Sequence, residues 1–397
     1  MTINRLPHIA SALSADLKAR LIATLVNLIR IDSRSAVANT NHIIAYLNRN
    51  ARQYGLDSVV TGPTGGPDSL IITIKGKNSR KDGLILLSHL DTADWEEKSW
   101  LYHPLSATRT KDGRIYGRGA IDCKSLSAIW FQLCIEFSRS ESIPEKDICF
   151  IATSDEETGK GEGINWVLEN SDIPDRCKFA INEGGGYICT SENQQQKIIT
   201  CQYGEKGRIK IHSAPRFDRY ESIIHEKGVF GSLRRFSMVR SQKKAQKQFR
   251  TFTIKPDLIH CYFSTVKSDS DNTMLYNHPA ADFRKLISML LQSGSIEQSS
   301  SFQTESQANA SPLNTRLYRI IENCSRTAGF TRVFPSITCG YCDNRFLRAK
   351  GIITYGFFPV GLRENLSSMH DSNECIHQNS LFDAYQLLST IVKSFVY

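Results

Sequence analysis

The sequence predicts an α/β protein, with a sheet covered by helices on both faces, that is interrupted by an inserted α+β unit. In the first part of the chain, short apolar runs rich in Ile and Leu alternate with segments of helical periodicity. The same alternation returns towards the carboxyl terminus, and the segment between differs in charge and texture. We therefore predict one domain in two pieces, residues 1–197 and 309–397, around a smaller domain at 198–308.

The first piece contains the predicted elements in order. Apolar residues at helical spacing predict a helix over residues 15–31 and a second over 41–54. The runs SLIITIKG and GLILLSHLD follow as buried strands. Helices near 125–137 and 163–170 then alternate with the strands DICFIATS and KFAINE.

The inserted and final segments are interpreted in the same way. Inside the insertion we expect a strand, a long basic helix near 221–248, the strand TFTIKPDLIHCYFS and a helix near 279–292. The exit from the insertion, SGSIEQSSSFQTESQANASP, has the composition of a linker or loop. A helix near 313–327, the strand GIITYGFF and a helix near 381–396 complete the chain.

Composition places the chain among globular proteins. Its 397 residues are 40% apolar and 22% charged, and no run approaches the length of a membrane span. We expect no membrane association. Residues 1–21 lack the apolar core of a secretory signal, and the 11 cysteines are odd in number without framework spacing. A cytoplasmic protein is therefore expected.

The positive charge is local. Residues 201–260 hold 14 Lys and Arg against 5 Asp and Glu, which equals the whole formal charge of +9. The favoured interpretation is a solvated basic helix, and the alternative is a surface for an anionic ligand or nucleic acid. We do not expect nucleic acid to be the main partner.

Metal-ligand side chains follow several predicted strands. Because ligands of open α/β sheets gather beyond the carboxyl ends of the strands, these side chains are expected at one edge of the sheet. A further carboxylate follows YGRGA and precedes a predicted helix. The set comprises His89, Asp91, Asp122, Glu156, Glu157 and Glu183.

The spacing of these residues suggests separate tasks. His89 and Asp91 are two apart, so in an extended chain both project to the same side, and Asp91 can hold the second imidazole nitrogen. Asp122 can be a helix N-cap or can bridge two cations. Of the adjacent Glu156 and Glu157, one is expected to bind metal and the other to move protons, the alternative being a solvent-facing acidic loop.

The chain contains, in this order, the motifs SHLDT, WLYHPLSATRTKDGRIYGRGAIDCKS, SDEETGKGEG, FAINEGGG and SMHDSNECI. Together these five motifs resemble the M20 family of metallopeptidases and N-acyl amino-acid deacylases. The resemblance covers residues 15–197 and 310–397. It implies a doubly wound mixed-sheet catalytic domain, interrupted by a smaller ferredoxin-like α+β lid that commonly dimerises, with a co-catalytic dizinc site. A homodimer is therefore expected.

The resemblance also implies a role for each matched residue. His89 and Glu183 resemble the ligands of one metal, and Glu157 and His370 those of the other. Asp122 resembles the bridging ligand, Glu156 the general base, and Asp91 the partner of His89. A carboxylate and imidazole ligand set without thiolate independently suits Zn²⁺, Co²⁺ or Mn²⁺.

Two further residues are expected to contact substrate. Arg345, in CGYCDNRFLRAKG, resembles the family residue that pairs a substrate carboxylate, for which a guanidinium offers a bidentate fork. His212 resembles the lid histidine that reaches a partner's active site. The pair Cys339 and Cys342 forms a CxxC, for which redox chemistry or half a zinc site is the alternative.

These patterns predict a dizinc hydrolase that cleaves an amide beside a free carboxylate. It would act as a carboxypeptidase on short peptides or as an N-acyl amino-acid amidohydrolase. The alternatives are an aminopeptidase of related fold, or a catalytically retired binding protein with a basic lid.

Overall fold

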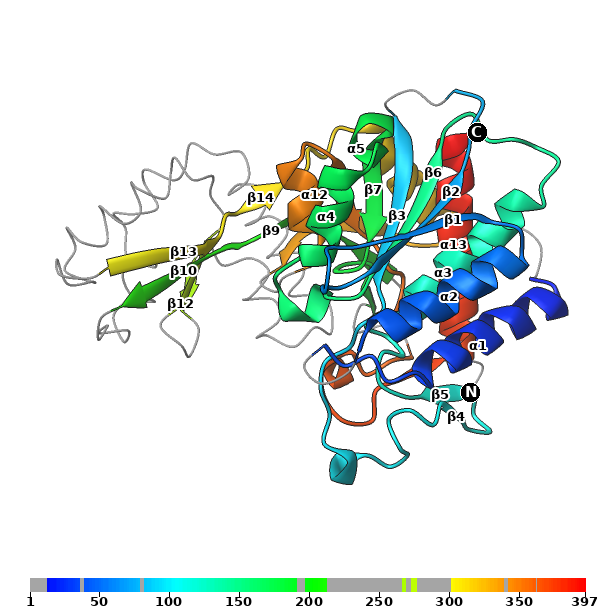
Figure 1. Ribbon diagram of the computed structural model, residues 1–397, viewed down its shortest axis with the longest axis horizontal. Helices are drawn as coiled ribbons and strands as arrows, with labels where there is room; N and C mark the ends of the chain where they lie inside the picture. The colour runs from blue at the N-terminus through cyan, green and yellow to red at the C-terminus, as the bar shows by residue number, and fades with distance from the viewer. Residues whose placement is uncertain are drawn as a thin grey trace.

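The computed structural model describes residues 13–35, 39–78, 82–190, 197–212, 266–268, 273–276, 301–338, 342–361 and 363–397 (Figure 1). The predicted basic helix, the strand at 251–264 and the helix near 279–292 lie outside these residues. In the described part of the chain, no helix is both long and apolar enough to cross a membrane.

A ten-stranded mixed sheet forms the centre of the molecule. Its strand order is β1-β2-β6-β3-β7-β16-β9-β14, and β8 and β15 also pair with β9. The strands are β1 (Asp57–Thr61), β2 (Ser69–Ile74), β3 (Gly83–His89), β6 (Ile148–Thr153), β7 (Cys177–Asn182), β8 (Ile188–Thr190), β9 (Lys197–Glu205), β14 (Asn309–Ala310), β15 (Arg332–Thr338) and β16 (Ile353–Gly356).

The middle of this sheet is parallel. β3 pairs in parallel with both β6 and β7, and β7 pairs in parallel with β16. At one edge β1 and β2 are antiparallel. The carboxyl ends of β3, β6 and β7 therefore meet at the same edge of the sheet, as the sequence predicts.

Helices cover both faces of the sheet, which confirms the predicted α/β class. Strand β3 is buried throughout, with Leu84 and Leu86 in one apolar cluster and Ile85 and Leu87 in the other. One face carries α1 (Ala15–Ile29), α2 (Asn41–Gln53), α3 (Lys124–Ser138), α11 (Arg316–Thr327) and α13 (Gln378–Val396). The other carries α4 (Glu162–Asn170), α5 (Ile173–Arg176) and α12 (Asn344–Ala349) (Figure 1).

Two smaller sheets complete the described structure. One joins β11 (Val266–Ser268), β12 (Thr273–Tyr276), β10 (Gly207–His212) and β13 (Ser301–Ser306), and it projects away from the large sheet (Figure 1). The other joins β17 (Cys375–His377), β5 (Arg114–Tyr116) and β4 (Thr108–Arg109). The chain leaves the large sheet after β9 and returns to it at β14. The domain boundaries at 197/198 and 308/309 stay a prediction.

The interpretation of the polar exit run as a linker is wrong for part of its length. Residues 301–306 form β13, and residues 309–310 form β14. β13 is held by antiparallel pairing with β10, a segment far earlier in the chain. A Ser- and Gln-rich composition favours loops, but backbone pairing in a sheet overrides such a weak local preference.

Candidate active site

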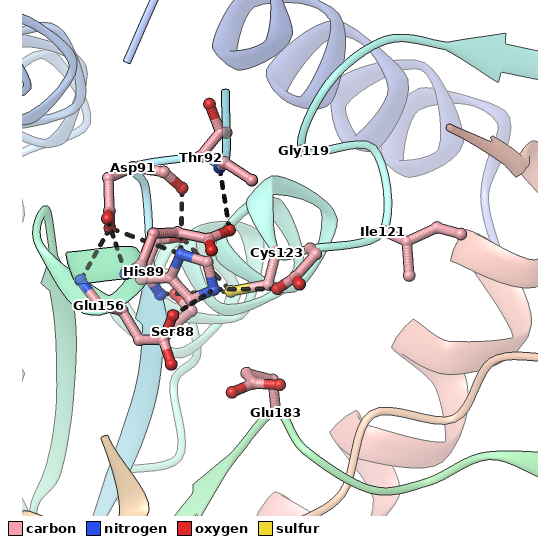
Figure 2. A network of polar contacts seen from close by, with 12 residues as sticks. Ser88, His89, Asp91, Thr92, Gly119, Ile121, Cys123, Glu156 and Glu183 are labelled. Atoms are coloured by element: carbon pink, nitrogen blue, oxygen red, sulfur yellow. Dashed lines mark hydrogen bonds and ion pairs between the residues drawn. The ribbon is translucent and has the colours of Figure 1, made fainter. Parts of the chain in front are cut away.

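His89 is the first of the predicted site residues to be placed by the fold. It ends β3, where its side chain is buried. Its Nε2 lies 3.0 Å from Asp122 Oδ1 and 3.8 Å from Glu156 Oε2. Its Nδ1 lies 3.0 Å from the main-chain oxygen of Asp91 and 3.5 Å from the Asp91 carboxylate (Figure 2). One imidazole nitrogen is thus fixed, and the other faces carboxylates.

Asp91 organises more than the histidine. Its carboxylate is fully buried and accepts hydrogen bonds from the main-chain N–H groups of Glu156, at 3.1 Å, and Glu157, at 3.0 Å. It also accepts the hydroxyl of Ser35 at 2.9 Å. These bonds fix the single turn η2 (Glu156–Thr158) that follows β6. Asp91 therefore orients both glutamates, a wider task than the sequence suggests.

Asp122 links two histidines that are far apart in sequence. Its Oδ1 faces His89, and its Oδ2 lies 3.0 Å from His370 Nε2. Burial alone would raise the pKa of Asp122, but the hydrogen bonds with His370 and His89 lower it well below its usual value. The N-cap alternative is wrong, because α3 begins at Lys124 after Cys123 and no side chain caps it.

Glu157 and His370 form the open side of the site. Glu157 Oε2 lies 3.2 Å from His370 Nε2, and Glu157 Oε1 accepts the main-chain N–H of Ala93 at 3.0 Å. The His370 side chain is 57% exposed, so the site is accessible from this side. The hydrogen bonds with Asp122 and Glu157 raise the pKa of His370 to about 10. A solvent-facing acidic loop is excluded, because the side chains of Glu156 and Glu157 are 10% and 8% exposed.

Glu183 follows β7 and approaches the same space from another strand. Figure 2 shows its carboxylate turned towards that of Glu156. Burial, and then the charge of Asp122, raise its pKa to about 8. Glu183 does not belong to the three groups of metal-ligand side chains whose ligand atoms lie within 4.8 Å in the described residues. These groups are His89 with Asp122 and Cys123, His89 with Glu156 and Glu157, and Asp122 with Glu157 and His370.

The chemistry of this donor set fits divalent cations. Carboxylates and imidazoles are ligands of Zn²⁺, Co²⁺ and Mn²⁺. Buried carboxyl groups that lie close together tend to stay protonated unless a cation binds between them. Cys123 lies beside His89, and its sulfur is 3.2 Å from the main-chain nitrogen of that residue. Burial raises the pKa of the Cys123 thiol to about 12.

The predicted substrate-binding residues are placed less completely. Arg345 lies on α12, and its guanidinium donates to the main-chain oxygen of Gly159, directly after η2. His212 ends β10, opposite Ser301, and its side chain lies outside the described structure. Cys339 also lies outside it, whereas the buried Cys342 thiol donates to Glu205 at 2.9 Å. The CxxC alternative therefore stays untested.

Two buried carboxylates beside the site were not singled out from the sequence. Asp343 accepts a hydrogen bond from the hydroxyl of Thr153, the last residue of β6, at 3.0 Å. Glu374 lies behind Asp122 and accepts its main-chain N–H at 3.0 Å. Asp343 lies in the motif CGYCDNR and Glu374 in the motif SMHDSNECI. The motifs around them therefore pointed to the site, although nothing in the spacing of these two residues singled them out.

The buried Asp343 should make the stability of the metal-free protein depend on pH. Burial, and then the charge of Asp155, raise its pKa to about 7, whereas it titrates near pH 4 in an unfolded chain. Between these values the folded protein holds a proton that the unfolded chain has released, so stability falls as pH rises. Asp343→Asn should reduce the slope of the free energy of unfolding against pH between pH 4 and 7 by up to about 1.4 kcal/mol per pH unit, as measured by urea unfolding.

The control for this measurement is Asp371→Asn, which alters an exposed carboxylate next to His370 in the sequence. It should leave the slope of the wild-type curve unchanged. Equal slopes for wild type and Asp343→Asn would contradict the raised pKa.

Beyond the carboxyl edge of a mixed α/β sheet, imidazoles and carboxylates thus converge in the arrangement of a metal-dependent hydrolase. The family description Peptidase family M20/M25/M40 matches residues 85–394. The chain therefore belongs to this family of metal-dependent enzymes, and it is a hydrolase that acts on amide bonds.

Two relatives illustrate the similarity, one over most of the chain at low identity and one over a short part of it at higher identity. Aminoacylase-1 of Sus scrofa is 23% identical over 380 residues, which span 88% of this chain and 89% of that protein. Acetylornithine deacetylase of Buchnera aphidicola is 35% identical over only 99 residues, 24% of this chain and 25% of that protein.

Solved structures share the fold. The M20 family metallo-carboxypeptidase Sso-CP2 from Sulfolobus solfataricus has a TM-score of 0.67 at 15% identity, covering 94% of this chain and 99% of that one. Human carnosine dipeptidase 1 has a TM-score of 0.66 at 13% identity, covering 96% of both chains. A dinuclear metal-binding peptidase of Bacillus subtilis has a TM-score of 0.59 at 12% identity, covering 96% and 99%.

Proposed function

We propose that the protein is a dizinc hydrolase in which Asp122 bridges the two ions. The observation that carries this proposal is that one carboxylate presents one oxygen to His89 and the other to His370. The remaining ligands would be Glu183 beside His89 and Glu157 beside His370. Zinc suits this ligand set, and Co²⁺ or Mn²⁺ would serve in its place.

Glu156 is the general base of the proposed reaction. When bound, two cations supply a water of lowered pKa and an electrophile for the amide carbonyl. Burial raises the pKa of Glu156 well above its usual value, so its carboxylate is a stronger base than that of an exposed glutamate. The same carboxyl group then returns the proton to the leaving amine. Asp91 holds the main chain of Glu156, so the base is fixed relative to His89.

The substrate is proposed to carry a free carboxylate beside the amide that is cleaved. Arg345 would pair this carboxylate as a bidentate fork, for which its position next to η2 is suitable. Short peptides and N-acyl amino acids both meet this description. Their chemistry also agrees with the names of the relatives, an aminoacylase, a metallo-carboxypeptidase and a dipeptidase.

A substrate panel tests this proposal. Protein loaded with Zn²⁺ or Co²⁺ is given matched dipeptides and N-acetyl amino acids with the same carboxyl-terminal residue, each beside its carboxamide analogue. We expect cleavage of free-carboxylate substrates and none of the carboxamides. A requirement for a free substrate amine would favour an aminopeptidase. Bound metal without turnover on any member would favour a retired binding protein.

A homodimer is proposed as the working assembly, with His212 of each lid completing the site of the other subunit. Family resemblance supports this assignment. Light scattering at micromolar concentration should give twice the chain mass of 44.7 kDa. A monomer that is fully active would contradict it, and salt-sensitive retention of nucleic acid would promote the binding-protein alternative.

A further inference from the structure

We propose that Glu374 is a positioning residue of the metal centre, which fixes Asp122 relative to His370. This inference rests on the proposed two-metal function. Glu374 lies four residues after His370, and its side chain is fully buried. It belongs to none of the groups of metal-ligand side chains in the described residues, so its role is carried through the main chain of the segment that holds Asp122.

Four donors converge on the Glu374 carboxylate. Oε1 accepts the main-chain N–H groups of Ile121, at 2.6 Å, and Asp122, at 3.0 Å. Oε2 accepts the main-chain N–H of Gly119 and a guanidinium N–H of Arg118, both at 3.0 Å. Every contact is a donation to the carboxylate, so its ionised form is the one that satisfies the whole set.

The main chain around Glu374 holds the same segment from the other side. Gly117 donates its N–H to the Glu374 main-chain oxygen at 2.9 Å. The next residue, Cys375, begins β17 and pairs with Tyr116 of β5. One residue therefore fastens both ends of the segment between β5 and Asp122. Because His370 lies on the same short stretch as Glu374, its distance from Asp122 is set through these bonds.

Arg118 supplies the charge that makes this burial tolerable. Its side chain is 2% exposed, and besides Glu374 it donates to the main-chain oxygen of Asp94 at 3.1 Å. The segment that follows Arg118 also requires a glycine at position 119. Gly119 has φ +83°, and a Cβ there would lie 2.9 Å from side-chain atoms of Lys124 and Thr92. The Glu374 carboxylate thus accepts hydrogen bonds along the whole segment from Arg118 to Asp122.

Glu374→Gln is the sharpest test because it is nearly isosteric. The amide NH₂ that replaces one oxygen has to face donors, either the N–H groups of Ile121 and Asp122 or those of Gly119 and Arg118. This donor–donor conflict displaces the segment that carries Asp122. Loss of outer-shell partners of metal ligands typically costs about 10–100-fold in metal affinity. We expect a rise of that size in the Kd for Co²⁺.

The measurement is a titration of metal-free protein with Co²⁺ against a competing chromophoric chelator. The matched control is Asp147→Asn. Asp147 is also buried, paired with an arginine, Arg176 at 2.6 Å, and bonded to a main-chain N–H, that of Gly76 at 2.8 Å. It precedes β6, at the opposite end of the strands from the site. Asp147→Asn should lose about as much thermal stability as Glu374→Gln, yet its Kd for Co²⁺ should stay within about twofold of that of the wild type.

Activity gives a second reading. With Glu374→Gln, saturating Co²⁺ should restore most of kcat, whereas Asp147→Asn should need no extra metal. If Glu374→Gln does not fold, Arg118→Lys is measured in its place, since lysine keeps the charge but not the two separated donors. The inference would be overturned if the variant measured, Glu374→Gln or Arg118→Lys, had the same Kd for Co²⁺ as Asp147→Asn. Failure of the wild type to bind Co²⁺ would instead overturn the proposed function itself.

Discussion

Replacing Glu156 with glutamine is expected to lower turnover by roughly 10²–10⁴-fold, the usual contribution of general acid–base catalysis, while the fold and both ions remain. The amide has nearly the shape of the carboxylate but cannot accept a proton from water. The main-chain bond from Glu156 to Asp91 does not involve the altered atoms, so the turn should persist. Steady-state kinetics and elemental analysis on the same preparation measure the two effects.

Glu157→Gln is the matched control, because it makes the same change one residue further on. Glu157 faces His370 and is proposed as a ligand, and a neutral amide oxygen binds metal less well than a carboxylate. This variant should lose one ion and recover part of its activity in excess zinc. If zinc instead rescued Glu156→Gln while Glu157→Gln kept both ions without activity, the two roles would have to be exchanged. If neither lost activity, the proposed mechanism would be wrong.

Asp122→Ala should remove both ions and leave no measurable turnover. Among the residues that the structure describes, Asp122 is the one carboxylate in contact with both His89 and His370, so its loss takes a ligand from each proposed ion at once. Elemental analysis after dialysis should find about two divalent ions per chain in wild type and close to none in the variant.

Asp371→Ala serves as the control for this loss, since it removes an exposed carboxylate beside His370. It should keep both ions. Full metal retention by Asp122→Ala would remove the bridging assignment, and loss of a single ion would reduce Asp122 to an ordinary ligand.

Much of the site could be predicted because it depends on local patterns. Strands β3, β6 and β7 are apolar runs that end in polar side chains, and parallel pairing brings those ends together. The sequence therefore located His89, Glu156 and Glu183 at one edge without knowledge of the strand order.

What could not be predicted depends on contacts between distant segments. The bond from Asp122 to Glu374 joins residues 252 apart in the sequence, and neither residue differs in type from many surface carboxylates. The polar composition of residues 301–306 favours a linker, and their pairing as β13 with β10, at the other end of the insertion, has no signal in that local composition. The contact of Asp91 with both glutamates was missed for the same reason, since spacing alone described only its relation to His89.

The strand order also constrains how the protein is made. β16 lies between β7 and β9 in the sheet, although it follows both in the sequence and is synthesised long after them. Until residues 353–356 emerge from the ribosome, β7 has an unpaired edge next to the buried β3, and such edges promote aggregation of partly made chains. His370 emerges later still. The acidic side chains of the site, from Asp91 to Glu183, are therefore synthesised before the strand β16 and the histidine that complete the site. This order favours folding of the domain after synthesis rather than during it.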